Sequence, residues 1–185
     1  MSTEAAPSSA ATPASVAAGD VCLETERLLL RRLAPDDAPA LFRTVGDPAV
    51  MRYWLPGPDL DAERTRDRIA DIEAHWDTHG FGDYAVVTRE GRRLIGFAGL
   101  HHIADMDEVN IGYALERAQW RHGLGGELCR RLTAFGFQVL DLPRIIAVID
   151  PANVASQRLV ERCGFTLWKR FEWAGHDRVA YSITP

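Results

Sequence analysis

Apolar residues along the chain recur at two spacings, one typical of strands and one typical of helices. Near the start, residues 28–33 predict a strand, and the acidic positions after Pro35 predict a short helix. Residues 60–78 are apolar at every third or fourth position and charged on the other face, which predicts an amphipathic helix. Its apolar face is formed by Thr65, Ile69, Ile72 and Trp76.

Three strand-like runs follow at 83–89, 93–101 and 107–115, separated by turns at Gly91 and Asp105. Strands joined by short turns pair antiparallel, so we expect a meander. A helix should then begin within the glycine-rich segment that comes next and end before a proline. The apolar stripe expected on this helix consists of Leu124, Leu128, Leu132, Phe135 and Val139.

The C-terminal part repeats the alternation of strand and helix. A buried strand is expected at 144–149, a helix at 153–163 and two strands near 166–173 and 178–184. Asn153 is a natural helix cap. The order of elements predicts an α/β fold with a mixed sheet and helices on both faces.

Composition indicates an ordinary globular protein, with 46% hydrophobic and 25% charged residues among 185. We expect one domain at 21–185 behind a disordered tail at 1–20, which is rich in Ala, Ser, Thr and Pro and lacks the basic residues of a targeting signal. The formal charge of −5 argues against nucleic acid as a partner, and no apolar run is long enough to span a membrane. Three cysteines at unrelated spacings predict no disulfide framework and fit a cytoplasmic protein.

A glycine-rich segment between the strand at 107–115 and the following helix carries the first sign of chemistry. It reads Trp-Arg-His-Gly-Leu-Gly-Gly-Glu over residues 120–127. Its glycines let a phosphate approach the backbone, and the first turn of a helix offers unpaired N–H donors with a partial positive charge. Arg121 and His122 add cationic or donor groups. The alternative is a glycine-rich turn that only joins two elements.

A second segment places Asn153, Ser156 and the pair Gly164-Phe165 after a buried strand. The glycine-rich loop, a helix, a strand and then Asn-x-x-Ser…Gly-Phe together resemble the acetyl-CoA-dependent N-acetyltransferase (GNAT) superfamily. The chain is most similar to the branch that contains the ribosomal-protein N-terminal acetyltransferases. The resemblance extends from about residue 23 to the end. Three further segments carry it: 25–31, 94–100 and 111–113.

The resemblance implies acetyl-CoA as co-substrate and a sheet whose central strands splay to admit the pantetheine arm. The backbone of Tyr113 and Leu115 would pair with the arm, and the N–H of Leu115 would polarise the thioester carbonyl. Asn153 would bond the arm or a backbone group beside it. No metal is needed, and adjacent histidines at 101 and 102 point to opposite faces of a strand. The pyrophosphate would be held by Arg121, His122, Gly123, Leu124, Gly125 and Gly126.

The attacking amine must be neutral, which at pH 7 costs a lysine-like amine about 4.6 kcal/mol but an α-amine only about 1–1.4 kcal/mol. Many relatives place a Glu two residues before the strand glycine, where this chain has Asn110. Glu108, on the same face of the strand, is therefore our first candidate base. A solvated strand end is its alternative role. His101 is the second candidate because a free histidine titrates near pH 6.5.

The leaving thiolate needs a proton donor, which in many relatives is a Tyr at the position of Val160. In the ribosomal branch a serine plays this part, which makes Ser156 the candidate acid, unless it only bonds its own helix. Tyr53 and Trp54 are expected to form an apolar lip for the acceptor.

The leading hypothesis is acetyl transfer to a primary amine by direct attack in a ternary complex. The acceptor is either a protein or peptide N-terminus or a small-molecule amine, and homodimers are common among relatives. A CoA-binding regulatory module without turnover is the alternative, supported by the missing Glu and Tyr.

Overall fold

The computed structural model describes residues 21–185, and the tail expected at 1–20 lies outside them. The strands are β1 Val21–Glu24, β2 Leu28–Arg32, β3 Asp83–Thr88, β4 Leu94–Ile103, β5 Glu108–Leu115, β6 Ile145–Ile149, β7 Thr166–Trp173 and β8 His176–Ile183. The α-helices are α1 Ala38–Val45, α2 Ala62–His79, α3 Leu124–Gln138 and α4 Val154–Arg162. Short 3-10 helices are η1 Pro35–Asp37, η2 Met51–Tyr53, η3 Ala104–Met106 and η4 Arg117–Gln119.

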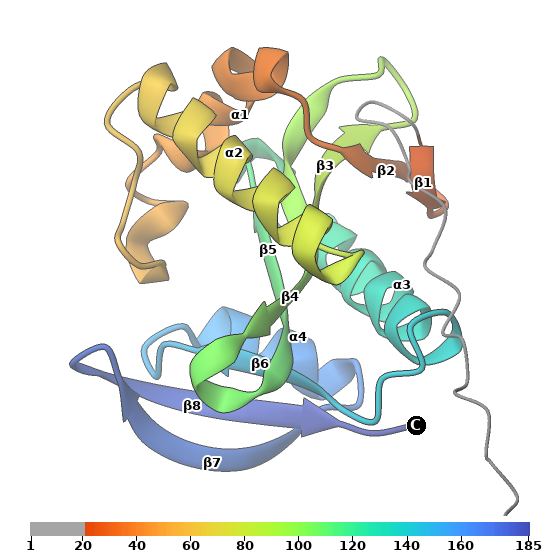
Figure 1. Cartoon of the computed structure of the whole chain (residues 1–185), viewed down its shortest axis with the longest axis vertical. Helices are drawn as coiled ribbons and strands as arrows, with labels where there is room; N and C mark the ends of the chain where they lie inside the picture. The colour runs from red at the N-terminus through yellow and green to blue at the C-terminus, as the bar shows by residue number, and fades with distance from the viewer. Residues whose placement is uncertain (1–20) are drawn as a thin grey trace, which may run out of the picture.

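All eight strands of the described chain join one sheet, in the order β1-β2-β3-β4-β5-β6-β8-β7 (Figure 1). The run β3-β4-β5 is an antiparallel meander, as the alternating pattern predicts. The pair β5 and β6 is parallel, and the remaining pairs are antiparallel. The expected α/β class with a mixed, mostly antiparallel sheet is therefore confirmed.

The two faces of the sheet carry separate hydrophobic clusters, because successive strand side chains point in opposite directions. On β3, Val86 packs with Leu128 and other buried residues of α3. The neighbouring Val87 packs instead with Leu41 of α1 and Ile69 of α2. Helices thus cover both faces, as expected.

One detail of the predicted helix pattern is wrong and another is confirmed. The stripe on α3 is correct at Leu124, Leu128 and Leu132, which are buried, but wrong at Val139, which is 66% exposed. The helix ends at Gln138, and Val139 is its C-cap, whose N–H still donates to the carbonyl of Phe135 while its side chain faces solvent. Asn153 caps α4 as expected, since its side chain accepts a hydrogen bond from the backbone N–H of Ser156.

The junction between β5 and β6 is the feature that positions the site. Only Asn110 and Ile146 are in register there, whereas β4 and β5 are paired from Gly96–Leu115 to Ile103–Glu108. The two parallel strands therefore meet at one point and separate beyond it. This confirms the splay implied by the family resemblance, and it leaves one edge of β5 without a strand partner.

Candidate active site

A cavity of about 220 Å³ opens where β5 and β6 separate. Its walls come from these two strands, β4, α4 with the residues before it, the C-terminal hairpin, and the end of η2 with the segment after it. The lining residues are Tyr53, Trp54, Leu55, His101, Ile103, Asn110, Ile111, Gly112, Tyr113, Ala147, Val148, Ile149, Asp150, Asn153, Ser156, Val160, Trp173 and Arg178. The predicted lip residues Tyr53 and Trp54 thus lie in the same cavity as His101, Asn153 and Ser156.

The backbone of β5 faces this gap at alternate residues. The N–H of Glu116 donates to the carbonyl of Ile95 in β4 at 2.9 Å, so the peptide groups of Leu115 and Tyr113 point the opposite way. On that side the carbonyl of Leu115 accepts the indole N–H of Trp120 at 2.8 Å. Trp120 therefore covers one end of the edge and leaves the N–H of Leu115 toward the gap.

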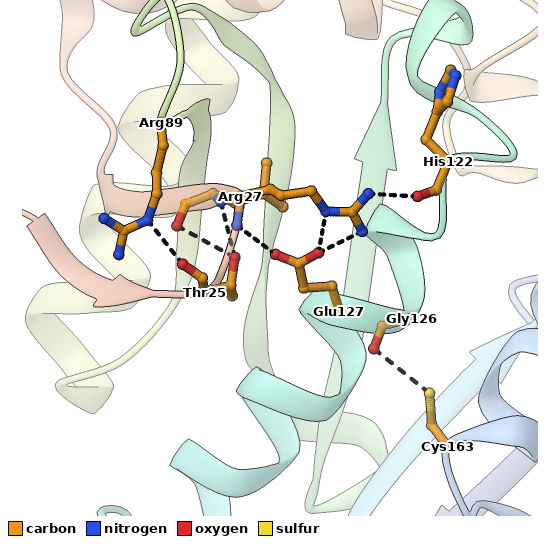
Figure 2. Close-up of polar contacts among 8 residues, drawn as sticks. Thr25, Arg27, Arg89, His122, Gly126, Glu127 and Cys163 are labelled. Carbon is orange, nitrogen blue, oxygen red and sulfur yellow. Dashed lines mark hydrogen bonds and ion pairs between the residues drawn. The ribbon is translucent and has the colours of Figure 1, made fainter.

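Arg27 holds the glycine-rich loop through hydrogen bonds to a backbone carbonyl and to a carboxylate (Figure 2). Its guanidinium donates to the carbonyl of His122 at 2.8 Å and pairs with the carboxylate of Glu127 at 2.6 Å. The backbone N–H of Arg27 also donates to Glu127 at 2.9 Å. Burial would raise the pKa of Glu127, but hydrogen bonds from Thr25 and Arg27 outweigh it and lower that pKa. The clamp occupies the carbonyl side of the loop, which leaves the N–H groups at the start of α3 to face outward.

The glycines of the loop are needed for different reasons. Gly123 has a φ of +79°, a left-handed conformation that most side chains disfavour. A Cβ on Gly125 would lie 2.7 Å from Leu159 of α4, so this glycine allows α3 and α4 to approach closely. Cys163, at the end of α4, contacts the carbonyl of Gly126 through its sulfur at 3.9 Å (Figure 2).

A second, more open depression lies beside the loop and is lined by Asp47, Arg117, Ala118, Trp120 and Arg121. Two arginines with an exposed indole suit a phosphate and an aromatic base. Arg121 was expected here from the sequence, whereas Arg117 was not, because it precedes the glycine motif.

Ser156 lies in the cavity within reach of a second hydroxyl. The phenol of Tyr113 donates to Oγ of Ser156 at 3.4 Å. Burial raises the pKa of Tyr113 to about 12, and its hydrogen bond with Ser156 acts in the opposite direction. The Tyr113 side chain was not singled out from the sequence, which pointed only to its backbone. The structure brings a tyrosine hydroxyl to the side of α4 although Val160 replaces the family tyrosine.

His101 and Asn110 face each other across β4 and β5 and both line the cavity. Nε2 of His101 lies 3.2 Å from Nδ2 of Asn110. Oδ1 of Asn110 accepts the backbone N–H of Val148 in β6 at 2.8 Å. Nδ1 of His101 is buried and has no hydrogen-bond partner among the described residues.

Glu108, the first candidate base, is not brought to this cavity. Its carboxylate is paired with the guanidinium of Arg144, and it is absent from the lining. The carboxylate that does line the cavity is Asp150, at the end of β6, and it pairs with the buried Arg178 at 3.2 Å. A polar residue just after a buried strand was the sequence signal that could have indicated Asp150.

No cluster of three or more His, Cys, Asp or Glu that could hold a metal ion occurs within residues 21–185. His102 turns away from His101 and contacts Asp107 at 3.1 Å. Over the same part of the chain, the helices are too short or too polar to cross a membrane.

An eight-stranded sheet with one split parallel pair thus lies next to a glycine-rich helix start in an α/β fold. Residues 27–166 match the acetyltransferase (GNAT) domain family. An uncharacterized N-acetyltransferase of Bacillus subtilis, YoaA, is 32% identical over 144 residues, which are 77% of this chain and 81% of the relative. The chain therefore belongs to the GNAT family of N-acetyltransferases.

Solved structures show the same fold. An acetyltransferase from Agrobacterium tumefaciens shares a TM-score of 0.78 and 27% identity, over 88% of this chain and 94% of its own. A ribosomal L7/L12 α-N-protein acetyltransferase, RimL, in complex with coenzyme A has a TM-score of 0.75 at 20% identity, over 89% and 98%. These likenesses place the chain among enzymes of a family that uses acetyl-CoA.

Proposed function

We propose that this enzyme transfers the acetyl group of acetyl-CoA directly to a primary amine within a ternary complex. The observation that carries the proposal is the split between β5 and β6, which opens into a cavity holding Ser156 and lies close to the glycine-rich loop. The pyrophosphate would bind the loop at residues 121–126, and the pantetheine arm would extend the sheet along Tyr113 and Leu115. Asn153, which caps α4, borders the same gap.

The thioester carbonyl would be polarised by the N–H of Leu115 as the amine attacks. When the tetrahedral intermediate collapses, the carbon–sulfur bond breaks and CoA leaves as a thiolate. Ser156 would donate its hydroxyl proton to this sulfur and recover one from Tyr113, with which it is hydrogen-bonded, and the phenol would be reprotonated from water. The proton that the attacking nitrogen carries in the intermediate would be released to water as the amide forms. The high pKa of Tyr113 keeps its phenol protonated at neutral pH.

The acceptor is either a protein or peptide N-terminus or a small amine that enters past Tyr53 and Trp54. A site for small polyamines would need several free carboxylates. Asp150 is the one carboxylate in the described cavity lining, and Arg178 neutralises it. This favours a peptide N-terminus as the first acceptor to try.

The test is acetyl-CoA turnover, followed as release of free thiol, with a panel of short peptides of differing first residue and a matched panel of small amines. Turnover with a peptide series supports the proposal, and turnover confined to small amines assigns the other acceptor class. Binding of acetyl-CoA without turnover on any amine would instead support a regulatory CoA-binding module.

A further inference from the structure

The donor and acceptor roles within the His101–Asn110 pair follow from a single backbone contact. Oδ1 of Asn110 must be the atom that faces the N–H of Val148 at 2.8 Å, because a backbone N–H only donates. The other amide atom, Nδ2, therefore faces Nε2 of His101 at 3.2 Å, and it too only donates. Nε2 is thus the acceptor and carries no proton. A neutral His101 must hold its proton on Nδ1.

The acidic group that interacts with His101 is Asp83. Asp83 lies in β3, where it is paired with Gly99 of β4, and it interacts by charge with His101. Burial raises the pKa of Asp83, while His101 and Arg68 act to lower it. Oδ1 of Asp83 is, like Nδ1 of His101, a buried polar atom without a described partner.

The remaining groups around His101 do not compete for that proton. His75 of α2 interacts with it by charge, but both of its own nitrogens are bonded, one to the carbonyl of Phe81 and one to the N–H of His102. Trp54 and the ring of His101 both border Gly112: a Cβ there would lie 3.2 Å from the indole and 3.4 Å from the imidazole.

The cavity therefore offers no unengaged base near pH 7 within the described chain. Both nitrogens of His101 are committed, one by Asn110 and one by its own proton. The carboxylate of Asp150 accepts from the N–H of Ala152 at 2.8 Å and from Arg178 at 3.2 Å. Asn110, which occupies the position of the base in many relatives, contributes an amide that cannot take a proton.

We infer that Asn110 is a positioning residue with two roles. It fixes the point at which β5 and β6 separate, and it holds His101 as the tautomer with its proton on Nδ1, which is a hydrogen-bond donor. His101 then cannot act as the base considered from the sequence, and the acceptor amine must enter the cavity already neutral. This second part rests on the proposed acetyl transfer, whereas the tautomer does not. At pH 7 about one α-amine in ten is neutral but only about one lysine-like amine in 2,500.

The tautomer is tested by nitrogen NMR of the histidine rings in the whole protein, with His102 as the internal reference. We expect His101 to show a protonated Nδ1 and an unprotonated Nε2. In Asn110→Asp, which keeps an acceptor for Val148 but presents a carboxylate to the ring, the proton should appear on Nε2. A wild-type spectrum with a protonated Nε2 overturns the inference, and this spectrum decides the matter even where the variant does not fold.

The neutral-amine part is tested by kcat/KM between pH 6 and pH 10 with two peptides, one offering only an α-amine and one only a lysine side chain. We expect the α-amine profile to rise about tenfold per pH unit and to level off near pH 8, and the lysine profile to rise with the same slope up to about pH 10 without levelling off. In His101→Gln the slope of kcat/KM against pH should be unchanged, even if the plateau value of kcat/KM changes. An additional inflection that disappears in that variant would identify His101 as a base. Absence of turnover with either peptide would reject the proposed function and leave the NMR result standing.

Discussion

In the mechanism that we propose, Ser156 and Tyr113 would together supply the proton donor, from side chains on two different elements. The family tyrosine on the last helix is replaced by Val160, yet the phenol of Tyr113 reaches the same helix from β5. A buried phenol with a pKa of about 12 is a donor over the whole range in which amines are acetylated. Under this proposal Tyr113 would be the protonated group that restores the proton of Ser156.

Replacing Ser156 with Ala should lower kcat by about 100-fold or more, because general acid catalysis typically contributes that much. The affinity for acetyl-CoA should change little, since the loop is untouched. Steady-state kinetics and equilibrium binding separate the two effects. Ser182→Ala, in β8 outside the cavity, is the matched control. An unchanged kcat in Ser156→Ala would remove this residue from the mechanism.

Tyr113→Phe keeps the ring beside Gly125 but removes the hydroxyl. The loss of one neutral hydrogen bond should reduce kcat by about 2- to 10-fold. Because the pKa of Tyr113 is raised to about 12, the wild-type profile should show no fall assignable to this phenol up to pH 10. The comparison is a pH–rate profile of both proteins with one acceptor. Identical kcat values in the two proteins would mean that the phenol serves packing alone.

At the scale of elements, the start of β2 and the start of α3 form one binding unit. The carboxylate of Glu127 and the guanidinium of Arg27 join them, although the two residues are 100 positions apart. Arg27→Ala should weaken acetyl-CoA binding by a few-fold to tenfold, since the partly exposed clamp holds the loop. Arg89→Ala, which removes a neighbouring arginine bonded to Thr25, is the control (Figure 2). Equal effects of the two changes in calorimetric titrations would argue against the clamp.

The end of α2 is attached to β4 by a histidine that must be neutral. Nδ1 of His75 contacts the carbonyl of Phe81 at 2.9 Å, and Nε2 accepts the N–H of His102 at 2.9 Å. Burial lowers the pKa of His75, so protonation favours the unfolded chain. This contribution to stability should be complete above pH 6.5 and decline as the pH falls below it. Urea unfolding at pH 7.5 and 5.5 measures the decline, which should be smaller in His75→Gln; an equal decline would assign it to other groups.

At the scale of the whole molecule, acetyl-CoA should stabilise the folded enzyme. A ligand at about 100 times its Kd adds roughly 2.7 kcal/mol, which corresponds to a rise in Tm of about 5–10 °C for a domain of this size. Thermal melts with acetyl-CoA, and with NAD or ATP as controls, measure this. Gly123→Glu should abolish the rise because it places a bulky acid at a left-handed position of the loop. Equal shifts with all three ligands would contradict a specific site.

Periodicity was sufficient to predict most of the fold. The apolar face of α2, the meander and the cap at Asn153 follow from local patterns, and all three are confirmed. Strand β1 was missed because its four residues carry too few alternations to be recognised. The stripe of α3 failed only at Val139, where the helix ends by local backbone geometry.

The candidate site was less predictable, because its key contacts join residues distant in sequence. Arg144 pairs with Glu108, and the side chain of Asn110 reaches Val148 on another strand. Neither partner can be chosen from spacing alone. The cofactor segment was easier to find, since its chemistry lies in consecutive backbone groups rather than in side chains brought together by folding.

The single register pair between β5 and β6 also bears on how the sheet avoids self-association. Exposed strand edges recruit strands of other chains and lead to aggregation. Here the unpaired edge of β5 faces another strand of its own sheet, and the two diverge from Asn110. A polypeptide that approaches from solvent therefore finds a gap that narrows toward Asn110 instead of an exposed strand edge. The fold can thus keep a vacant row of donors and acceptors for an extended small molecule while denying it to a neighbouring protein.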